Sequence, residues 1–158
     1  MVSVVFERRG GGFQAFVSVE PILSSSADPE LLLRKAEAVY GRYVEEMQEK
    51  INDIELHRKT HTLLPARKVW QVGDSVFRLV AELAELSLEM ADVYGHLCRD
   101  LGAKRKWLEK AIILRRYVPD LNLIPESMPW GRVEKGTRKA AEKLAQGLIP
   151  GQTPRARA

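Results

Sequence analysis

Apolar residues alternate with polar ones near the N-terminus and then recur at helical spacing over most of the chain. Residues 2–6 and 13–19 are rich in β-branched and aromatic side chains, and the sequence ERRGGG separates them. Such residues favour strands, and glycines permit a tight turn between them. The pattern predicts a β-hairpin over residues 2–19, with Arg8 and Arg9 at its tip. Because an isolated hairpin is marginally stable in water, we expect it to pack on helices or to pair with a second copy.

The next segment has the apolar spacing of one long helix. Asp28, Pro29 and Glu30 form a strong helix start, because Asp caps a helix and Pro fits its first turn. Apolar residues then recur at steps of three and four, which predicts a helix over 29–57. A seam this long usually packs along another helix, in the same chain or across a dimer axis. The seam consists of Leu33, Ala36, Tyr40, Tyr43, Met47, Ile51 and Ile54.

A second helix is predicted over residues 65–86. It starts at Pro65, a residue that the first turn tolerates, and it contains Gly73, which weakens it slightly. We expect a break or bend at Ser87 or Glu89. The predicted core face consists of Val69, Val72 or Val76, Phe77, Val80, Leu83 and Leu86.

Residues 94–113, YGHLCRDLGAKRKWLEKAII, contain two apolar stripes on either side of one glycine. Leu97 and Leu101 form the first stripe, and Gly102 supplies the left-handed residue that ends a helix. The spacing predicts two short helices joined by a tight turn within residues 90–116. The stripe resumes at Leu108, Ala111 and Ile112.

This segment resembles the helix-turn-helix superfamily of DNA-binding domains, whose pattern has a small residue in the first helix, a glycine at the turn and apolar residues on both sides. Cys98 takes the small position and Gly102 the turn, whereas Ala103 is smaller than the apolar residue that often follows the glycine. The resemblance implies DNA binding, with the N-terminal part of the second helix in the major groove. It also implies a set of outward residues that face DNA: Lys104, Arg105, Lys106, Glu109, Lys110 and Ile113.

The distribution of charge supports a polyanionic partner. Residues 1–100 hold 12 basic and 16 acidic side chains, whereas residues 101–158 hold 13 and 5. This concentration of positive charge predicts an electrostatic footprint for nucleic acid. An anionic membrane surface is less favoured, because the basic helix has no bulky aromatic face beyond Trp107. We expect Lys104, Arg105 and Lys106 to reach base edges. The full set expected to contact nucleic acid is Lys104, Arg105, Lys106, Lys110, Arg115, Arg116, Arg132, Lys135 and Lys139.

The C-terminal third begins with three prolines, at positions 119, 125 and 129, and these predict an extended segment. Its apolar side chains are expected to fill gaps in the core. A last helix is predicted over 132–148, and the tail 149–158 is expected to be disordered. The apolar side chains of the extended segment are Leu121, Leu123, Ile124, Met128 and Trp130.

The sequence contains little that predicts catalysis. We find no Ser-His-Asp arrangement, phosphate loop, dinucleotide fingerprint or zinc spacing. His57 and His61 stand four residues apart, but no HExxH pattern or cysteine pair accompanies them. The single cysteine, Cys98, cannot form an internal disulfide. We therefore expect a non-enzymatic protein with no catalytic residues, no metal and no cofactor.

The predicted fold class is mainly α, with an N-terminal β-hairpin followed by a helical bundle that contains a helix-turn-helix, in one domain over 1–148. With no secretion signal and no long apolar run, we expect a cytoplasmic protein with no membrane partner. The predicted function is binding of double-stranded DNA as a homodimeric regulator of transcription. The alternatives are a subunit of a larger nucleoprotein complex that grips RNA or single strands by their backbone, and a protein-binding adaptor. A basic helix face that is merely solvated is the plainest alternative.

Overall fold

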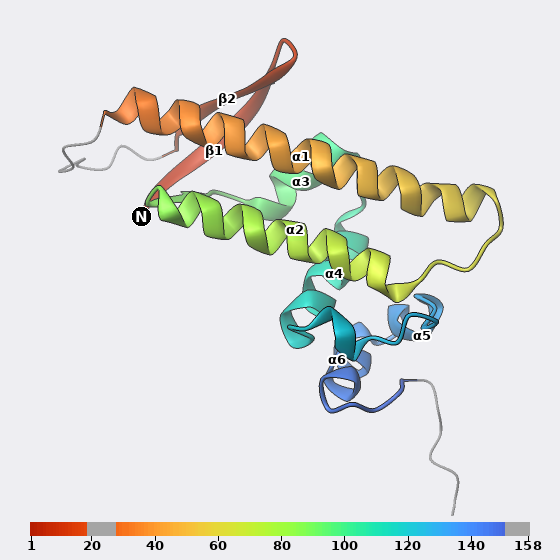
Figure 1. The fold of residues 1–158 in the computed structure, drawn as a ribbon. Helices are drawn as coiled ribbons and strands as arrows, with labels where there is room; N and C mark the ends of the chain where they lie inside the picture. The colour runs from red at the N-terminus through yellow and green to blue at the C-terminus, as the bar shows by residue number, and fades with distance from the viewer. Residues whose placement is uncertain (19–27, 151–158) are drawn as a thin grey trace, which may run out of the picture. The chain divides into compact units, whose positions relative to one another are not determined.

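The computed structural model describes residues 1–18 and 28–150 (Figure 1). The chain is mainly helical with a small N-terminal sheet, as the sequence predicts at that level. The chain divides into two compact units by its internal contacts, and the expectation of one domain over 1–148 stays a prediction. Unit 1 consists of Met1–Glu49 and Ser75–Leu108, and unit 2 consists of Lys50–Asp74 and Glu109–Ala158. Each unit is described by itself.

The predicted hairpin is present in unit 1. Strand β1 (Val2–Arg9) pairs antiparallel with β2 (Gly12–Val17), and Gly10 at the tip has a left-handed φ of 56°. A third strand, β3 (Leu88–Met90), pairs parallel with the start of β1, so the sheet order is β2-β1-β3. The sequence predicted only a break near Ser87, because three residues are too few for their alternation to be recognised. Residue 19, the last of the predicted hairpin, lies outside the described residues.

The sheet packs on helix α1 (Pro29–Lys59) through aromatic rings. Phe6 stacks on Tyr40 with ring centroids 4.2 Å apart, and Phe13 meets Tyr40 edge-on at 4.8 Å. The carboxylate of Glu37 accepts a hydrogen bond from the backbone N–H of Ala15 at 2.7 Å. This bond occupies a donor on the outer edge of β2, and the hairpin therefore obtains its support from α1.

Helix α1 begins where the sequence predicts and ends two residues later than the predicted 57. The backbone N–H of Glu30 donates to the carboxylate of Asp28 at 3.0 Å, which confirms the cap. Most of the predicted seam is buried, namely Ala36, Tyr40, Tyr43, Met47 and Ile54, while Leu33 and Ile51 are half-buried.

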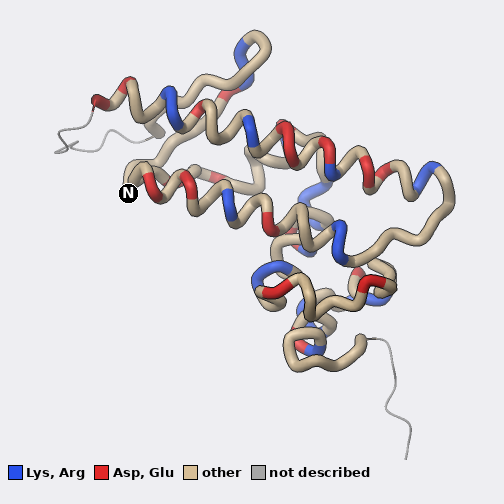
Figure 2. Tube along the Cα trace, in the orientation of Figure 1, with Lys and Arg blue, Asp and Glu red and all other residues tan. Residues whose placement is uncertain are grey.

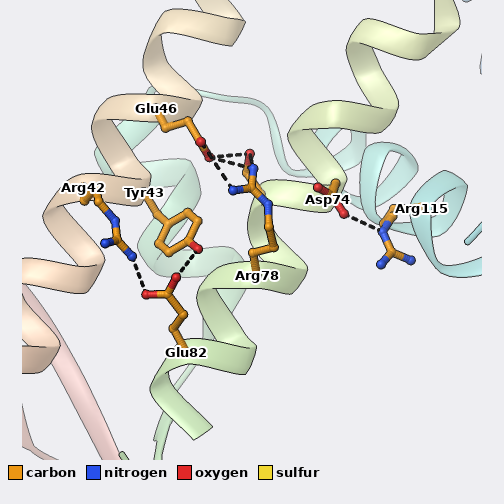
Figure 3. A network of polar contacts seen from close by, with 8 residues as sticks. Arg42, Tyr43, Glu46, Asp74, Arg78, Glu82 and Arg115 are labelled. Atoms are coloured by element: carbon orange, nitrogen blue, oxygen red, sulfur yellow. Dashed lines mark hydrogen bonds and ion pairs between the residues drawn. The ribbon is translucent and has the colours of Figure 1, made fainter. Parts of the chain in front are cut away.

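In unit 1, two carboxylates link α1 to helix α2 (Ala66–Glu85), as Figure 3 shows. Glu82 accepts a hydrogen bond from the Tyr43 hydroxyl at 2.6 Å and another from the Arg42 guanidinium. Glu46 accepts one from Arg78 at 3.0 Å. The hydrogen bond from Tyr43 lowers the pKa of the Glu82 carboxyl. Glu46 is therefore engaged within the chain and is not simply a solvated surface charge.

The buried stripe of α2 differs from the predicted one at one turn. Val80 is 42% exposed, and its assignment to the core is wrong. Leu79 is fully buried in its place, while Phe77 and Leu86 are half-buried. The observed stripe keeps steps of three and four residues, whereas the predicted set mixed two faces of the helix. The buried residues of this stripe are Val69, Val72, Val76, Leu79 and Leu83.

Unit 2 contains a close helix crossing at Gly73. A Cβ atom at this position would lie 2.2 Å from the backbone oxygen of Ala111 on helix α4 (Arg105–Tyr117). Only a glycine permits this approach, so Gly73 is a packing requirement of α2 as well as a weak point in its helix propensity. Nearby, the indole N–H of Trp70 donates to the carbonyl of Val118 at 2.6 Å.

The proline-rich segment of unit 2 fills its core, as predicted. Ile124, Met128 and Trp130 are buried. The segment includes a short 3-10 helix, Leu121–Leu123, and it pairs with residues 64–66 through two backbone hydrogen bonds of 2.7 and 2.8 Å. These bonds satisfy backbone groups that the prolines leave outside regular structure.

The single C-terminal helix predicted over 132–148 is instead two helices, α5 (Gly131–Glu134) and α6 (Thr137–Ala145). Gly136 between them has a left-handed φ of 76°, which a continuous helix does not contain. Helix α6 buries Thr137, Ala140, Ala141 and Leu144. The expectation of a disordered tail falls mostly on residues 151–158, which lie outside the described residues.

Candidate nucleic-acid interface

The first helix of the candidate interface, α3 (Val93–Leu101), lies in unit 1 and starts at an unusual cap. Asp92 has a left-handed φ of 47°, and its carboxylate accepts a hydrogen bond from the backbone N–H of Gly95 at 3.0 Å. A Cβ atom on Gly95 would lie 2.0 Å from that carboxylate. The helix therefore begins at a defined residue because Gly95 leaves room for its cap.

Two side chains of α3 take the place of a neighbouring strand beside Phe6. The backbone N–H of Phe6 donates to His96 Nε2 at 2.8 Å, and Arg99 donates to the Phe6 carbonyl at 2.6 Å. Strand β3 pairs with β1 only at Val2–Val4, so these groups of Phe6 need other partners. Because Nε2 accepts, the ring proton of His96 is on Nδ1, which donates to the carbonyl of Asp92 at 3.0 Å. The sheet thereby fixes the position of α3.

Asp100, at the end of α3, is the acceptor of a buried polar cluster. It accepts hydrogen bonds from the Tyr40 hydroxyl at 2.5 Å and from the Arg99 guanidinium at 3.0 Å. Burial acts to raise the pKa of the Asp100 carboxyl, but the donors Arg99 and Tyr40 outweigh it and hold that pKa below its usual value. Burial and the Asp100 carboxylate together raise the pKa of Tyr40 far above its ordinary value.

Arg8, which the sequence placed at the tip of the hairpin, also contacts this helix. Its guanidinium donates to the backbone carbonyl of Asp100 at 3.3 Å and lies 4.8 Å from the centre of the Phe13 ring. An arginine near a helix C-terminus satisfies a carbonyl that has no partner within the helix. Arg8 therefore has a role within unit 1 and is not simply a solvated turn residue.

The connection between α3 and α4 is short, as the sequence predicts. Gly102 has φ 65° and ψ 22°, the left-handed conformation that ends α3, and α4 begins at Arg105. Three residues thus separate the helices, a length typical of a helix-turn-helix connection. On the flanks, Leu97, Leu101 and Leu108 of unit 1 are buried, as are Ala111 and Ile112 of unit 2.

Three cations stand at the start of α4 in unit 1. Lys104, Arg105 and Lys106 are exposed, and the first turn of α4 contains no acidic residue. The helix dipole places partial positive charge at this end, so each cation there is disfavoured by about 0.3 to 1 kcal/mol. The arrangement costs stability in the free protein, and a bound anion would relieve it.

The remaining predicted residues of α4 belong to unit 2 and differ in their surroundings. Arg116 is exposed and Lys110 is half-buried. Arg115 donates to the carboxylate of Asp74 at 2.9 Å, and its guanidinium lies 5.3 Å from the centre of the Trp70 ring. Since Arg115 has these partners within unit 2, we leave it out of the interface proposed below.

The C-terminal helices of unit 2 add further exposed cations, Arg132, Lys135 and Lys139. None of these three forms an ion pair with a residue that the structure describes. Figure 2 marks the positions of lysine and arginine along the chain. Over the whole sequence, unit 2 has 15 basic and 8 acidic residues, a net charge of +7. Unit 1 has 10 and 13, a net charge of −3. The excess of positive over negative charge therefore belongs to unit 2, whereas Lys104, Arg105 and Lys106 belong to a unit with a net negative charge.

The sequence pattern assigned no role to Tyr94 or to the residues around Asp100. The ring of Tyr94 lies under the Arg105 guanidinium, 5.1 Å from centroid to carbon. No local pattern relates residues 6, 40 and 100, which come from three separate elements. An acid preceded by arginine at a helix end was the only available signal, and such pairs are common on solvated helices.

No metal site is evident among the described residues, since no three His, Cys, Asp or Glu side chains gather closely enough to hold one. Both ring nitrogens of His57 have partners, Lys68 at 2.8 Å and Thr62 at 2.8 Å. Within the described ranges, none of the helices has the length and apolar character needed to cross a bilayer. Comparison of the sequence with models of protein families, with curated proteins and with solved structures finds no match.

Proposed function

We propose that this chain binds double-stranded DNA through α3 and α4 as a helix-turn-helix and catalyses no reaction. The observation that carries the proposal is the exposed cluster of Lys104, Arg105 and Lys106 at the N-terminus of α4, directly after the turn at Gly102. The first turn of a recognition helix is the part that meets base edges. Cations that destabilise the free helix are readily explained by an anionic partner.

The proposed roles divide between base reading and backbone contact. Lys104, Arg105 and Lys106 reach base edges in the major groove, where Arg and Lys pair with the acceptors of guanine. Five cations of unit 2, four of them exposed and one half-buried, hold phosphates and contribute no sequence preference. These are Lys110, Arg116, Arg132, Lys135 and Lys139. In this proposal the protein acts as a homodimeric regulator, so its DNA site is an inverted repeat.

A second candidate is a subunit of a larger nucleoprotein complex that grips a nucleic-acid backbone without reading bases. The net charge of +7 on unit 2, carried by several helices, favours this candidate because backbone contact needs charge and no particular motif. A protein-binding adaptor would use the acidic residues of α1 to hold its partner. Glu46 and Glu37 already have partners within unit 1, and this hypothesis has the least support.

The test is selection of random-sequence duplex DNA by the purified chain at two salt concentrations, followed by sequencing. Enrichment of a short motif that Arg105→Ala abolishes supports base reading, with a loss of about 1 to 3 kcal/mol on the selected site. Lys139→Ala serves as the matched control, because it should weaken all sequences alike and reduce the salt dependence. Retention with no enriched motif would instead favour the subunit candidate, and no retention at either salt concentration would overturn both.

A further inference from the structure

Helix α6 in unit 2 exposes three cations that differ in their partners. Arg138 donates to the carboxylate of Glu142 at 3.3 Å, and its guanidinium lies 5.4 Å from the centre of the Tyr117 ring. Lys139 and Lys143 are exposed, and neither side chain has an ion pair or a hydrogen bond with a residue that the structure describes. The same helix thus carries one cation with an acidic partner and two cations without one among the described residues.

Lys139 and Lys143 lie on the same side of α6, because residues four apart in a helix are neighbours. They are about 6 Å apart along the helix axis. Two like charges at this spacing repel each other, and Glu142, the only acidic residue of α6, is paired with Arg138. The helix dipole favours Lys143 in the last turn but disfavours Lys139 in the first. A bound anion on this side would relieve both the repulsion and the cost at Lys139.

We propose that the side of α6 formed by Lys139 and Lys143 binds the phosphodiester backbone of single-stranded as well as double-stranded nucleic acid. This inference rests on the proposed function only in taking nucleic acid as the partner, and it adds Lys143 and single strands to that function. A nucleic-acid strand carries negative charges at regular intervals, so neighbouring ammonium groups can each meet a phosphate.

The residue types of α6 explain why the number of strands should not matter. A lysine ammonium is a point charge on a flexible stem, so it approaches a phosphate oxygen without needing the defined groove of a duplex. Helix α6 contains no aromatic residue on which the bases of a single strand could stack. The contact is therefore made to the backbone alone, and the same phosphates are present in single strands and duplexes.

An anionic lipid surface also offers phosphates, but α6 has no apolar side to insert into it. An interfacial helix buries its apolar side between the headgroups and the acyl chains. The apolar residues Ala140, Ala141 and Leu144 of α6 are instead buried within the folded chain. Because Leu148 and Ile149 follow the helix and are exposed, lipid vesicles are the competing probe in the test.

The test is an anisotropy titration of labelled oligothymidine and of a labelled random-sequence duplex with the full chain at two salt concentrations. We expect the double variant Lys139→Gln, Lys143→Gln to bind both probes several-fold more weakly. The slope of log affinity against log salt should become shallower by about 1.4 for the single strand and about 1.8 for the duplex, as for two lost phosphate contacts. The matched control is Arg58→Gln, Arg138→Gln, which removes the same charge from two exposed arginines of unit 2 that have acidic partners. It should have a much smaller effect on both probes.

Equal losses in the two double variants would show that net charge alone matters, and would overturn the inference. Binding of the duplex without binding of oligothymidine would also overturn it, while the proposed function would stand. Binding of vesicles of phosphatidylcholine and phosphatidylserine, with no binding of either nucleic acid, would overturn both. If selection enriches no DNA motif but the lysine variant still loses oligothymidine, only the proposed base reading fails, and this inference is supported.

Discussion

The two units hold their helices in place by different means. In unit 1, α3 is positioned by hydrogen bonds, with Asp100 buried between Tyr40 and Arg99 and with Phe6 satisfied by His96 and Arg99. In unit 2, α2 and α4 approach at Gly73 so closely that no side chain fits between them. The comparison shows that one unit depends on polar partners being complete, whereas the other depends on shape.

This difference bears on function because the proposed DNA-reading helix pair begins in the polar unit. A buried network stabilises only when every donor and acceptor has a partner, and a partly satisfied one is worse than an apolar core. Unit 1 thereby fixes the start of α3 at one position. The removal of one side chain from its polar network should cause a large loss of stability. Unit 2 keeps its excess positive charge at the surface, where it remains accessible to a polyanion.

The strongest test of the difference between the units is to remove one carboxylate from each and to compare the losses of stability. Asp100→Ala should destabilise the protein by about 3 kcal/mol, because the buried Tyr40 hydroxyl loses its acceptor and the half-exposed Arg99 guanidinium loses a charged partner. The matched change is Asp74→Ala in unit 2, whose ion pair with Arg115 is partly exposed. It should cost about 1 kcal/mol or less. Urea unfolding of both variants measures the difference, and equal losses would contradict the distinction between the units.

The next largest effect is expected from two glycine substitutions within helices. Gly73→Ala places a Cβ atom against the Ala111 backbone and should destabilise the protein by about 2 to 3 kcal/mol through overpacking. At Gly41 in unit 1, an added Cβ atom meets only Phe13, at an ordinary contact distance of 3.6 Å. Gly41→Ala should stabilise the protein by up to about 1 kcal/mol through helix propensity. A thermal melt in which both variants shift in the same direction would refute the packing account of unit 2.

A smaller change in the free energy of unfolding is expected from pH, and two residues of unit 1 should cause it. Since the pKa of Asp100 is lowered in the folded state, its stabilisation is fully present above the unfolded value near 4 and is lost as pH falls below it. The pKa of Tyr40 is raised, so its stabilisation is present below about pH 10 and is lost as pH rises further.

Single variants separate the acid and the alkaline limb of this dependence of stability on pH. Asp100→Asn should flatten the acid limb of the free energy of unfolding, and Tyr40→Phe should flatten the alkaline limb. The measurement is the urea midpoint of each variant and of the wild-type chain between pH 2.5 and 11. A difference between Asp100→Asn and wild type that stays constant from pH 7 to pH 2.5 would show that the Asp100 cluster is not the source.

Local patterns predicted much of the fold. Three features depend on residues close in sequence, and local patterns therefore predicted them. They are the hairpin, the start of α1 at Asp28 and the turn at Gly102. The strand β3, the break at Gly136 and the core role of Leu79 were missed, since each was decided by partners elsewhere or by a single residue within a continuous pattern.

The candidate site was predictable only in part. Lys104, Arg105 and Lys106 are exposed, as expected from their charge, because lysine and arginine are rarely buried without a partner. The partner of Arg115 did not follow from it, because Asp74 lies 41 residues away on another helix. Arg8 was likewise predicted only to lie at the hairpin tip, although it bonds to a carbonyl 92 residues away. Charge and spacing indicate which residues form a basic surface, but contacts distant in sequence decide which of them are available.

The most direct test of the proposed function is a fluorescence anisotropy titration of a labelled duplex carrying the selected motif, with two triple-alanine variants. One variant replaces Lys104, Arg105 and Lys106, and the matched variant replaces Arg132, Lys135 and Lys139. The account predicts that the first loses the preference for the motif over a scrambled duplex. The second should keep that preference and bind both duplexes more weakly, with a shallower salt dependence. Unchanged preference in the first variant would contradict the assignment of α4 as the DNA-reading helix.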